Sequence, residues 1–190
     1  MLAKLVKAVG AWGLVVLATL FGVFAAGYAF QDPGGWLAVG LVAAYVVPAV
    51  GLGLVAWRWP ERAMVTVVPV VVLVALPLFS DTVRGWFDEV GPVLALATGV
   101  AAVVLAILGL HRPGLAGTLL IAVAAFIFVQ LVIEANAVVE EPSPLGVLGT
   151  SGGVILLPMV VSGVLLLIAY ELERHAHRPA PTSRVRPAAA

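Results

Sequence analysis

The chain has 190 residues, of which 63% are hydrophobic and only 11% are charged, and its mean hydropathy is +1.16. Soluble domains carry about 25% charged residues, so this composition excludes an ordinary water-soluble fold. The formal net charge is zero, which gives no reason to expect a nucleic-acid partner. Cysteine is absent, and this excludes disulfides, thiolate metal sites and thiol redox chemistry.

The predicted fold is all-α: an integral membrane bundle of six helices that occupies residues 1–177 as one domain. A bilayer core of roughly 30 Å needs about 20 apolar residues per helix. Six apolar runs approach or reach that length, and Pro- and Gly-rich turns separate most of them. They predict helices at about 8–30, 36–57, 63–79, 93–110, 115–137 and 147–170, followed by a disordered cytoplasmic tail at 178–190. The helix breaker Thr150–Gly153 leaves open whether residues 145–148 belong to the sixth helix, and this helix can continue from Glu171 into water for a turn or two.

The first apolar run has two interpretations. Residues Ala8–Phe30 contain no charge over 23 positions, whereas the apolar region of a signal peptide spans about 7–15 residues. We therefore expect a retained first helix rather than a cleaved signal. Small residues at four-residue spacing predict close helix packing. They are Ala18, Gly22 and Ala26 in the first run, and Thr98, Ala102 and Ala106 in the fourth.

The segment Ser80–Val90 has a different pattern from the membrane runs. Its apolar side chains recur at helical spacing, and its charged residues fall largely elsewhere on the helical wheel. This predicts a short amphipathic helix at the outer interface, ended by Gly91 and Pro92. The alternative is a polar loop.

The charges are distributed unevenly between the two sides of the predicted bundle. If six helices alternate, nine basic and three acidic residues share one side, a net charge of +6, and one basic and seven acidic residues share the other, a net charge of −6. The positive-inside rule then predicts that both termini lie in the cytoplasm (N-in/C-in). The expected location is the plasma membrane. Trp57 and Trp59 at the inner boundary, and Trp36 and Trp86 at the outer one, match interfacial aromatic belts.

Polar groups inside the predicted helices are few. Single Thr and Ser hydroxyls can bond the backbone four residues earlier, so they suit packing. Gln130 and Glu134 share one helical face near the outer boundary and, with Asn136, are candidate contacts for an ion or solute. The alternative is a carboxylate that reaches interfacial water. Pro69 and Pro158 interrupt the third and sixth runs, and paired interruptions of this kind can mark a transport site.

No motif for catalysis, cofactor binding or metal binding is present in the sequence. His111 falls in a predicted turn, and His175 and His177 are spaced so that they do not share a helical face. The Gly51-x-Gly53 pair lies inside a membrane run and is not a phosphate loop. We therefore expect no catalytic residue, no cofactor and no metal ligand.

The leading hypothesis is a non-catalytic multi-pass membrane protein that acts as an accessory or scaffold subunit or as a homo-oligomer. Its expected partners are the lipid bilayer and other membrane subunits or further copies of itself. The alternative is a small transporter or channel for a neutral or weakly polar solute, and a lipid-modifying enzyme ranks third. A polar pocket between the third, fifth and sixth helices would favour transport, whereas a solid apolar interior would favour a scaffold.

Overall fold

A computed structural model describes residues 1–31, 35–62, 65, 93–138 and 154–176. In these ranges the regular secondary structure is helical, and no residue belongs to a strand. The described helices are α1 (Leu2–Gln31), α2 (Gly35–Arg58), α5 (Val93–Gly109), α6 (Pro113–Val138) and α8 (Leu156–Ala176). The predicted all-helical class is therefore confirmed for this part of the chain. Outside it lie the predicted helix at 63–79 apart from Val65, the interfacial helix at 80–90, residues 147–153 and the tail at 178–190.

Three stretches of the described helices are long and apolar enough to cross a membrane. They are Leu2–Phe24, Pro113–Ile133 and Leu156–Ala176. The apolar stretches Tyr45–Arg58 in α2 and Thr98–Gly109 in α5 are shorter. Large apolar side chains also cover outward-facing surfaces, including Leu20, Val23 and Val47. Such surfaces are compatible with a membrane location, where lipid rather than water surrounds them.

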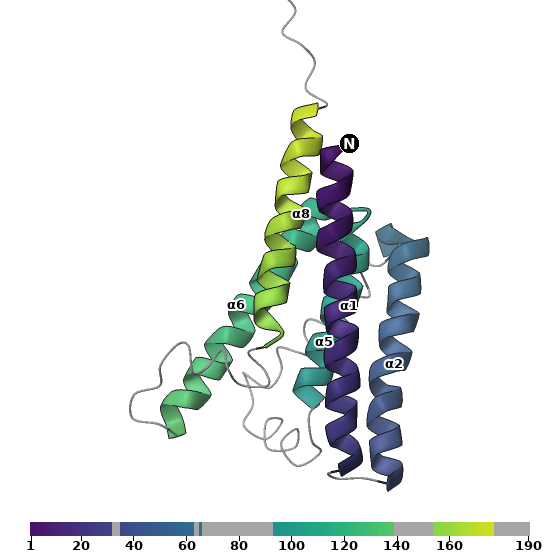
Figure 1. Cartoon of the computed structure of the whole chain (residues 1–190), viewed down its shortest axis with the longest axis vertical. Coiled ribbons are helices and arrows are strands. Elements are labelled where there is room, and N and C mark those ends of the chain that lie inside the picture. Colours follow the sequence, from purple (N-terminus) through teal and green to yellow (C-terminus); the bar gives the residue numbers. More distant parts are fainter. Residues whose placement is uncertain (32–34, 63–64, 66–92, 139–153, 177–190) are drawn as a thin grey trace, which may run out of the picture.

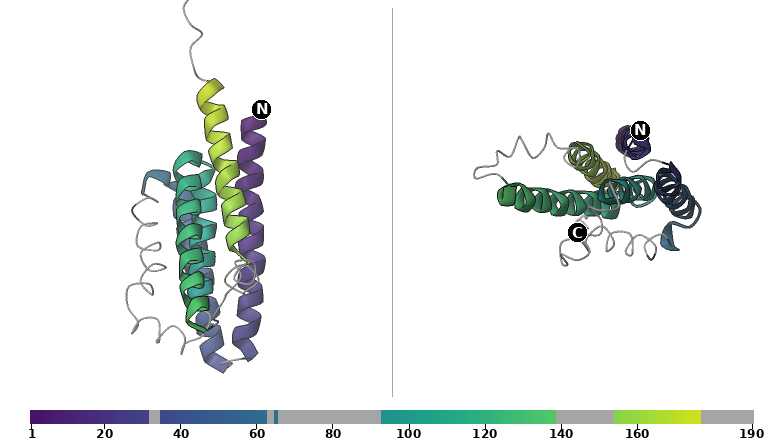
Figure 2. Two further views of the ribbon diagram at one scale, coloured as in Figure 1. Left: turned by 90° about the vertical axis from the view of Figure 1, so that its left-hand side faces the viewer. Right: turned by 90° about the horizontal axis from the view of Figure 1, so that it is seen from below.

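Helix α5 is the centre of the described bundle. It packs against α1, α2 and α6, and it touches α8 slightly (Figure 1). From Thr98 to Ala106 every residue of α5 is buried, and this run has no polar face. A helix that is apolar on all sides is stable only when other helices or lipid surround it. Helices α1, α2, α6 and α8 therefore lie around α5 (Figure 2).

Several helix ends lie at one end of the bundle, which we call the charged end. They are the start of α1, the end of α2, the end of α5, the start of α6 and the end of α8 (Figure 1). All six Lys and Arg residues among the described residues lie here with three glutamates, a net charge of +3. These residues are Lys4, Lys7, Arg58, Arg62, Arg112, Arg174, Glu61, Glu171 and Glu173.

The first and last described helices both extend beyond the apolar runs at the charged end. Helix α1 begins at Leu2 rather than near residue 8 as predicted, and α8 continues past residue 170 to Ala176, the turn or two that the sequence allows. The two extensions lie side by side beyond the ends of the other helices (Figure 2). The Lys7 ammonium joins them through an ion pair with Glu173 at 2.7 Å. The contact between α1 and α8 thus includes apolar side chains within the bundle and an ion pair at the charged end.

The other helix bounds are close to the predicted ones, with one exception. Those of α2, α5 and α6 lie within two residues of the predicted ranges. Helix α8 begins at Leu156, after a turn at 154–155, so the predicted sixth helix does not run unbroken from 147. The run of Gly residues at 152–153 explains the later start, because glycine weakens a helix interior.

Proline and glycine punctuate the helices at expected places. Pro113 is the first residue of α6, where the missing backbone N–H costs no helical hydrogen bond. Pro48 lies inside α2, and the helix continues through it to Arg58. Gly35 begins α2 with a φ of +59°, a backbone conformation that glycine adopts without a steric penalty.

Candidate functional site

The polar positions predicted near the outer boundary lie in the last third of α6. Gln130, Glu134 and Asn136 are part of this helix, but their side chains lie outside the described part of the structure. Pro69 also lies outside it. These residues remain predictions.

Pro158 lies in the first turn of α8, as the third residue of that helix. Proline fits a first turn because the N–H it lacks would have no partner within the helix. The amide of the next residue, Met159, donates to the carbonyl of Ile155 at 3.1 Å. In the described residues Pro158 therefore starts a continuous helix and does not interrupt one.

Tyr45 joins α2 to both α1 and α5. Its hydroxyl donates a hydrogen bond of 2.9 Å to the carbonyl of Ala18, and its side chain is buried. A Cβ atom on Gly22 would overlap the tyrosine ring, and one on Gly99 would lie 2.9 Å from it. The predicted small-residue line at Ala18 and Gly22 thus accommodates a ring rather than a helix backbone.

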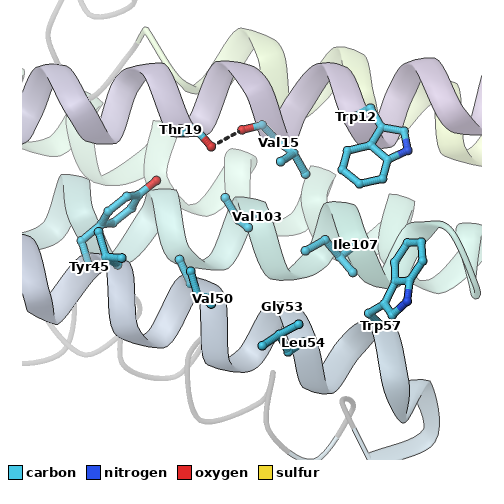
Figure 3. Close-up of a pocket in the computed structure, with 12 residues that line it drawn as sticks. Trp12, Val15, Thr19, Tyr45, Val50, Gly53, Leu54, Trp57, Val103 and Ile107 are labelled. Atoms are coloured by element: carbon cyan, nitrogen blue, oxygen red, sulfur yellow. Dashed lines mark hydrogen bonds between the residues drawn. The ribbon is translucent and has the colours of Figure 1, made fainter.

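An apolar groove runs between α1 and α2 with α5 as its floor, and we call it the α1–α2 groove (Figure 3). Its volume is about 500 Å³. Trp12, Val15 and Thr19 come from α1, and Val103 and Ile107 come from α5. The wall from α2 consists of Tyr45, Val46, Ala49, Val50, Gly53, Leu54 and Trp57.

Aromatic side chains lie at both ends of the α1–α2 groove. Tyr45 bridges α1 and α2 at one end. At the other end, the ring centroids of Trp12 and Trp57 are 6.4 Å apart. The Trp57 ring also meets His111 edge-on at 5.8 Å, which places this end of the groove beside the charged end. Between the two aromatic contacts the walls are separate, and α5 lies beneath them (Figure 3).

The two hydroxyl groups that line the groove have partners within the protein. The Thr19 hydroxyl donates to the carbonyl of Val15 at 2.7 Å, which is the bond four residues back that the sequence predicts. The Thr118 hydroxyl in α6 makes the equivalent bond to Gly114 at 2.9 Å. The groove therefore offers an apolar surface on which the hydroxyls of Thr19 and Tyr45 are already bonded.

Ser162 behaves differently from these threonines. Its side chain is 3% exposed, and its hydroxyl donates to the carbonyl of Gly10 in α1. The sequence predicts a packing role within its own helix, whereas the structure uses this hydroxyl to join α8 to α1. A polar bond between helices adds directionality that apolar packing lacks.

Helices α6 and α8 touch through glycine. A Cβ atom on Gly117 would lie 2.7 Å from the carbonyl oxygen of Gly163, and one on Gly163 would lie 3.0 Å from that of Gly117. The two backbones are therefore in direct contact, with no room for a side chain between these two positions.

The charged end has a second cavity of about 990 Å³ between the α5–α6 connection and α8. Its lining carries both signs of charge, from Arg112, Glu171 and Glu173. Arg112 pairs with Glu61 at 3.6 Å, and Glu171 pairs with Arg174 at 3.6 Å. No group of three or more acidic or histidine side chains in the described ranges could hold a metal ion.

The sequence alone does not single out the residues of the α1–α2 groove as a site. It predicts that Trp57 belongs to an interfacial aromatic belt, and it presents Tyr45 as one of several isolated hydroxyl groups. For Gly53 it indicates only that this residue does not form a phosphate-binding loop. A usable signal is present, because Trp57, Gly53, Ala49 and Tyr45 recur every fourth residue on one face of α2. The pattern does not say which helices form the opposite wall and the floor.

Comparison of the chain with known protein families, with curated proteins and with solved structures gave no match. The geometry of the described helices is therefore the basis for its proposed function.

Proposed function

We propose that the protein is a non-catalytic multi-pass membrane protein with six membrane helices, and that it acts as an accessory or scaffold subunit or as a homo-oligomer. The observation that carries this proposal is the apolar, closely packed interior around α5. The buried hydroxyls of Tyr45 and Ser162 both bond backbone carbonyls of α1, so they are committed to structure. Transport or catalysis in the membrane needs polar groups that are available to a solute.

We propose further that both termini lie on the cytoplasmic side. The clustering of the six described Lys and Arg residues at the charged end supports this orientation, because cytoplasmic segments are enriched in these residues. The end of α2 and the start of α5 lie at opposite ends of the bundle, which agrees with one further crossing between them (Figure 1). Buried Ala11, Leu14 and Ala18 make α1 part of the core, which supports its retention.

The absence of cysteine makes the orientation directly testable. Single variants Lys4→Cys, Arg62→Cys, Arg112→Cys and Gln31→Cys would be treated in intact cells with a membrane-impermeant maleimide. We expect labelling of Gln31→Cys alone, and labelling of all four after permeabilisation. Labelling of the three charged-end variants in intact cells would overturn the orientation.

The non-transporting role is tested in liposomes. Full-length protein reconstituted with entrapped glycerol, glucose or potassium should release each solute at the rate of protein-free liposomes. Release above that rate, reduced by Gln130→Leu or Glu134→Leu, would replace the scaffold proposal with the transporter alternative. Mass measurement of the same preparation in lipid nanodiscs would separate a homo-oligomer from a monomer that serves other subunits.

A further inference from the structure

We propose that the α1–α2 groove binds one acyl chain of an anionic phospholipid, with the headgroup at the charged end. The proposal concerns a site that the scaffold role does not require. It rests on the dimensions of the groove, on the aromatic residues at its two ends and on the charge at one end of it.

The length of the groove fits one leaflet of a bilayer. From Tyr45 to Trp57 the α2 wall rises about 18 Å at 1.5 Å per residue, and half of a hydrocarbon core is roughly 15 Å. A chain that enters beside Trp57 would therefore reach Tyr45 near the middle of the membrane. The bridge between Tyr45 and Ala18 ends the groove at that depth.

The width of the groove selects a hydrocarbon chain over a helix. A volume of about 500 Å³ over about 18 Å corresponds to a mean cross-section of about 28 Å². Carbon atoms in contact lie about 4 Å apart, so a single acyl chain fits a groove of this cross-section. A helix with side chains is about 10–12 Å across, so it could place only side-chain tips in the groove.

The charge beside the groove favours an anionic headgroup. Trp57 lines the groove, and the next residue, Arg58, is exposed at the end of α2. Arg62 follows one turn further, the intervening Glu61 pairs with Arg112 at 3.6 Å, and the His111 ring packs against Trp57. Basic residues with tryptophan at a helix end are typical of the level at which lipid phosphates lie. The apolar groove and its basic border thus match the two parts of one phospholipid.

The test uses full-length protein in detergent and the quenching of tryptophan by bromine. Trp36, Trp59 and Trp86 would be replaced by phenylalanine, so that Trp12 and Trp57 report on the groove. The probe is phosphatidylglycerol with one brominated acyl chain. We expect saturable quenching with one lipid per protein. Quenching that increases linearly with lipid and never saturates would overturn the site.

A matched pair of variants separates the groove from general lipid contact. Val50 is 55% exposed and lines the groove, whereas Val47 is 68% exposed and lies on the same helix outside it. Val50→Phe should weaken binding by about tenfold because the ring occupies the channel, and Val47→Phe should leave it unchanged. Val46→Phe provides a second filling variant if Val50→Phe does not fold. Equal affinities for the groove and control variants would contradict the proposal.

The headgroup is tested by the lipid and by charge. Phosphatidylcholine with the same brominated chain should bind about fivefold more weakly than phosphatidylglycerol. Arg58→Gln should remove this preference, whereas Arg174→Gln, at the same end but on α8, should keep it. Absence of any preference in the unaltered chain would overturn the anionic headgroup. If the protein is an oligomer and saturating lipid does not quench Trp12 and Trp57, a second copy of the chain occupies the groove instead of lipid. These measurements in detergent do not depend on membrane orientation, so failure of the orientation test would leave them intact.

Discussion

The α6–α8 contact and the α1–α2 contact join helices of similar composition in opposite ways. At the first, Gly117 and Gly163 bring two backbones together and leave no space. At the second, Tyr45, Trp12 and Trp57 bridge the helices at two levels, and the groove lies between those levels. Lipid is as apolar as leucine, so hydropathy does not choose between these outcomes. The size of the side chains at each helix crossing decides between a close contact and a groove.

Glycine is present at both contacts, but it serves different neighbours. Gly163 faces the backbone of α6, whereas Gly22 and Gly99 face the ring of Tyr45. Removal of a Cβ atom therefore permits either a close helix pair or a bound aromatic side chain. Substitutions at these contacts test the contrast, beginning with the largest expected effect.

Tyr45→Ala should destabilise the protein most. The substitution removes a buried ring that fills the space between Gly22 and Gly99, and such truncations cost about 3 kcal/mol or more. Thermal unfolding in detergent, followed by circular dichroism, measures the loss. Tyr45→Phe keeps the ring and loses only the bond to Ala18, so it should cost about 1 kcal/mol. Equal costs for the two variants would show that the ring does not fill this space.

Gly163→Ala should separate α6 from α8. The added Cβ would lie 2.8 Å from Ile121 and 3.0 Å from the carbonyl oxygen of Gly117, and crowding of this kind costs about 1–3 kcal/mol. Gly13→Ala in α1 is the matched control, because a Cβ atom added there would have no neighbouring atom within 4 Å. The control should be neutral or slightly stabilising in the same thermal assay. A similar loss in both variants would implicate helix backbone effects rather than the crossing.

Ser162→Ala should have a smaller effect. It removes the hydrogen bond from α8 to the Gly10 carbonyl while keeping the helix contact, and one such bond contributes about 0.5–1.5 kcal/mol. Thr118→Ala, which loses only a bond within α6, is the control and should change the unfolding temperature less. If Thr118→Ala costs as much, the Ser162 bond does not join the helices in a special way.

Disruption of the Lys7–Glu173 pair should have the smallest effect. Its side chains are 19% and 33% exposed, and pairs this accessible to solvent contribute about 0–1 kcal/mol. Lys7→Glu should lower the unfolding temperature slightly at low salt, and the added change Glu173→Lys should restore it. Loss of the difference in high salt would be the expected screening effect. No rescue in the double variant would show that the pair does not hold α1 against α8.

Several features of the fold could be predicted from local sequence. The bounds of α2, α5 and α6 follow from apolar length and from the Pro and Gly residues beside it. The early start of α1 could not, because this segment lies against α8, where Lys7 and Glu173 pair across 166 positions of sequence. The role of Tyr45 could not be predicted for the same reason. Its partners Ala18 and Gly99 lie on two other helices, and periodicity within α2 carries no information about them.

The sequence by itself determined the helical class, the apolar surfaces and the asymmetry of charge, because each follows from local composition and the length of apolar runs. Only the tertiary structure decided which helices meet closely and which leave a groove. That choice depends on the shapes of side chains from different helices, such as Gly117 against Gly163 and Trp12 against Trp57, at the points where those helices cross.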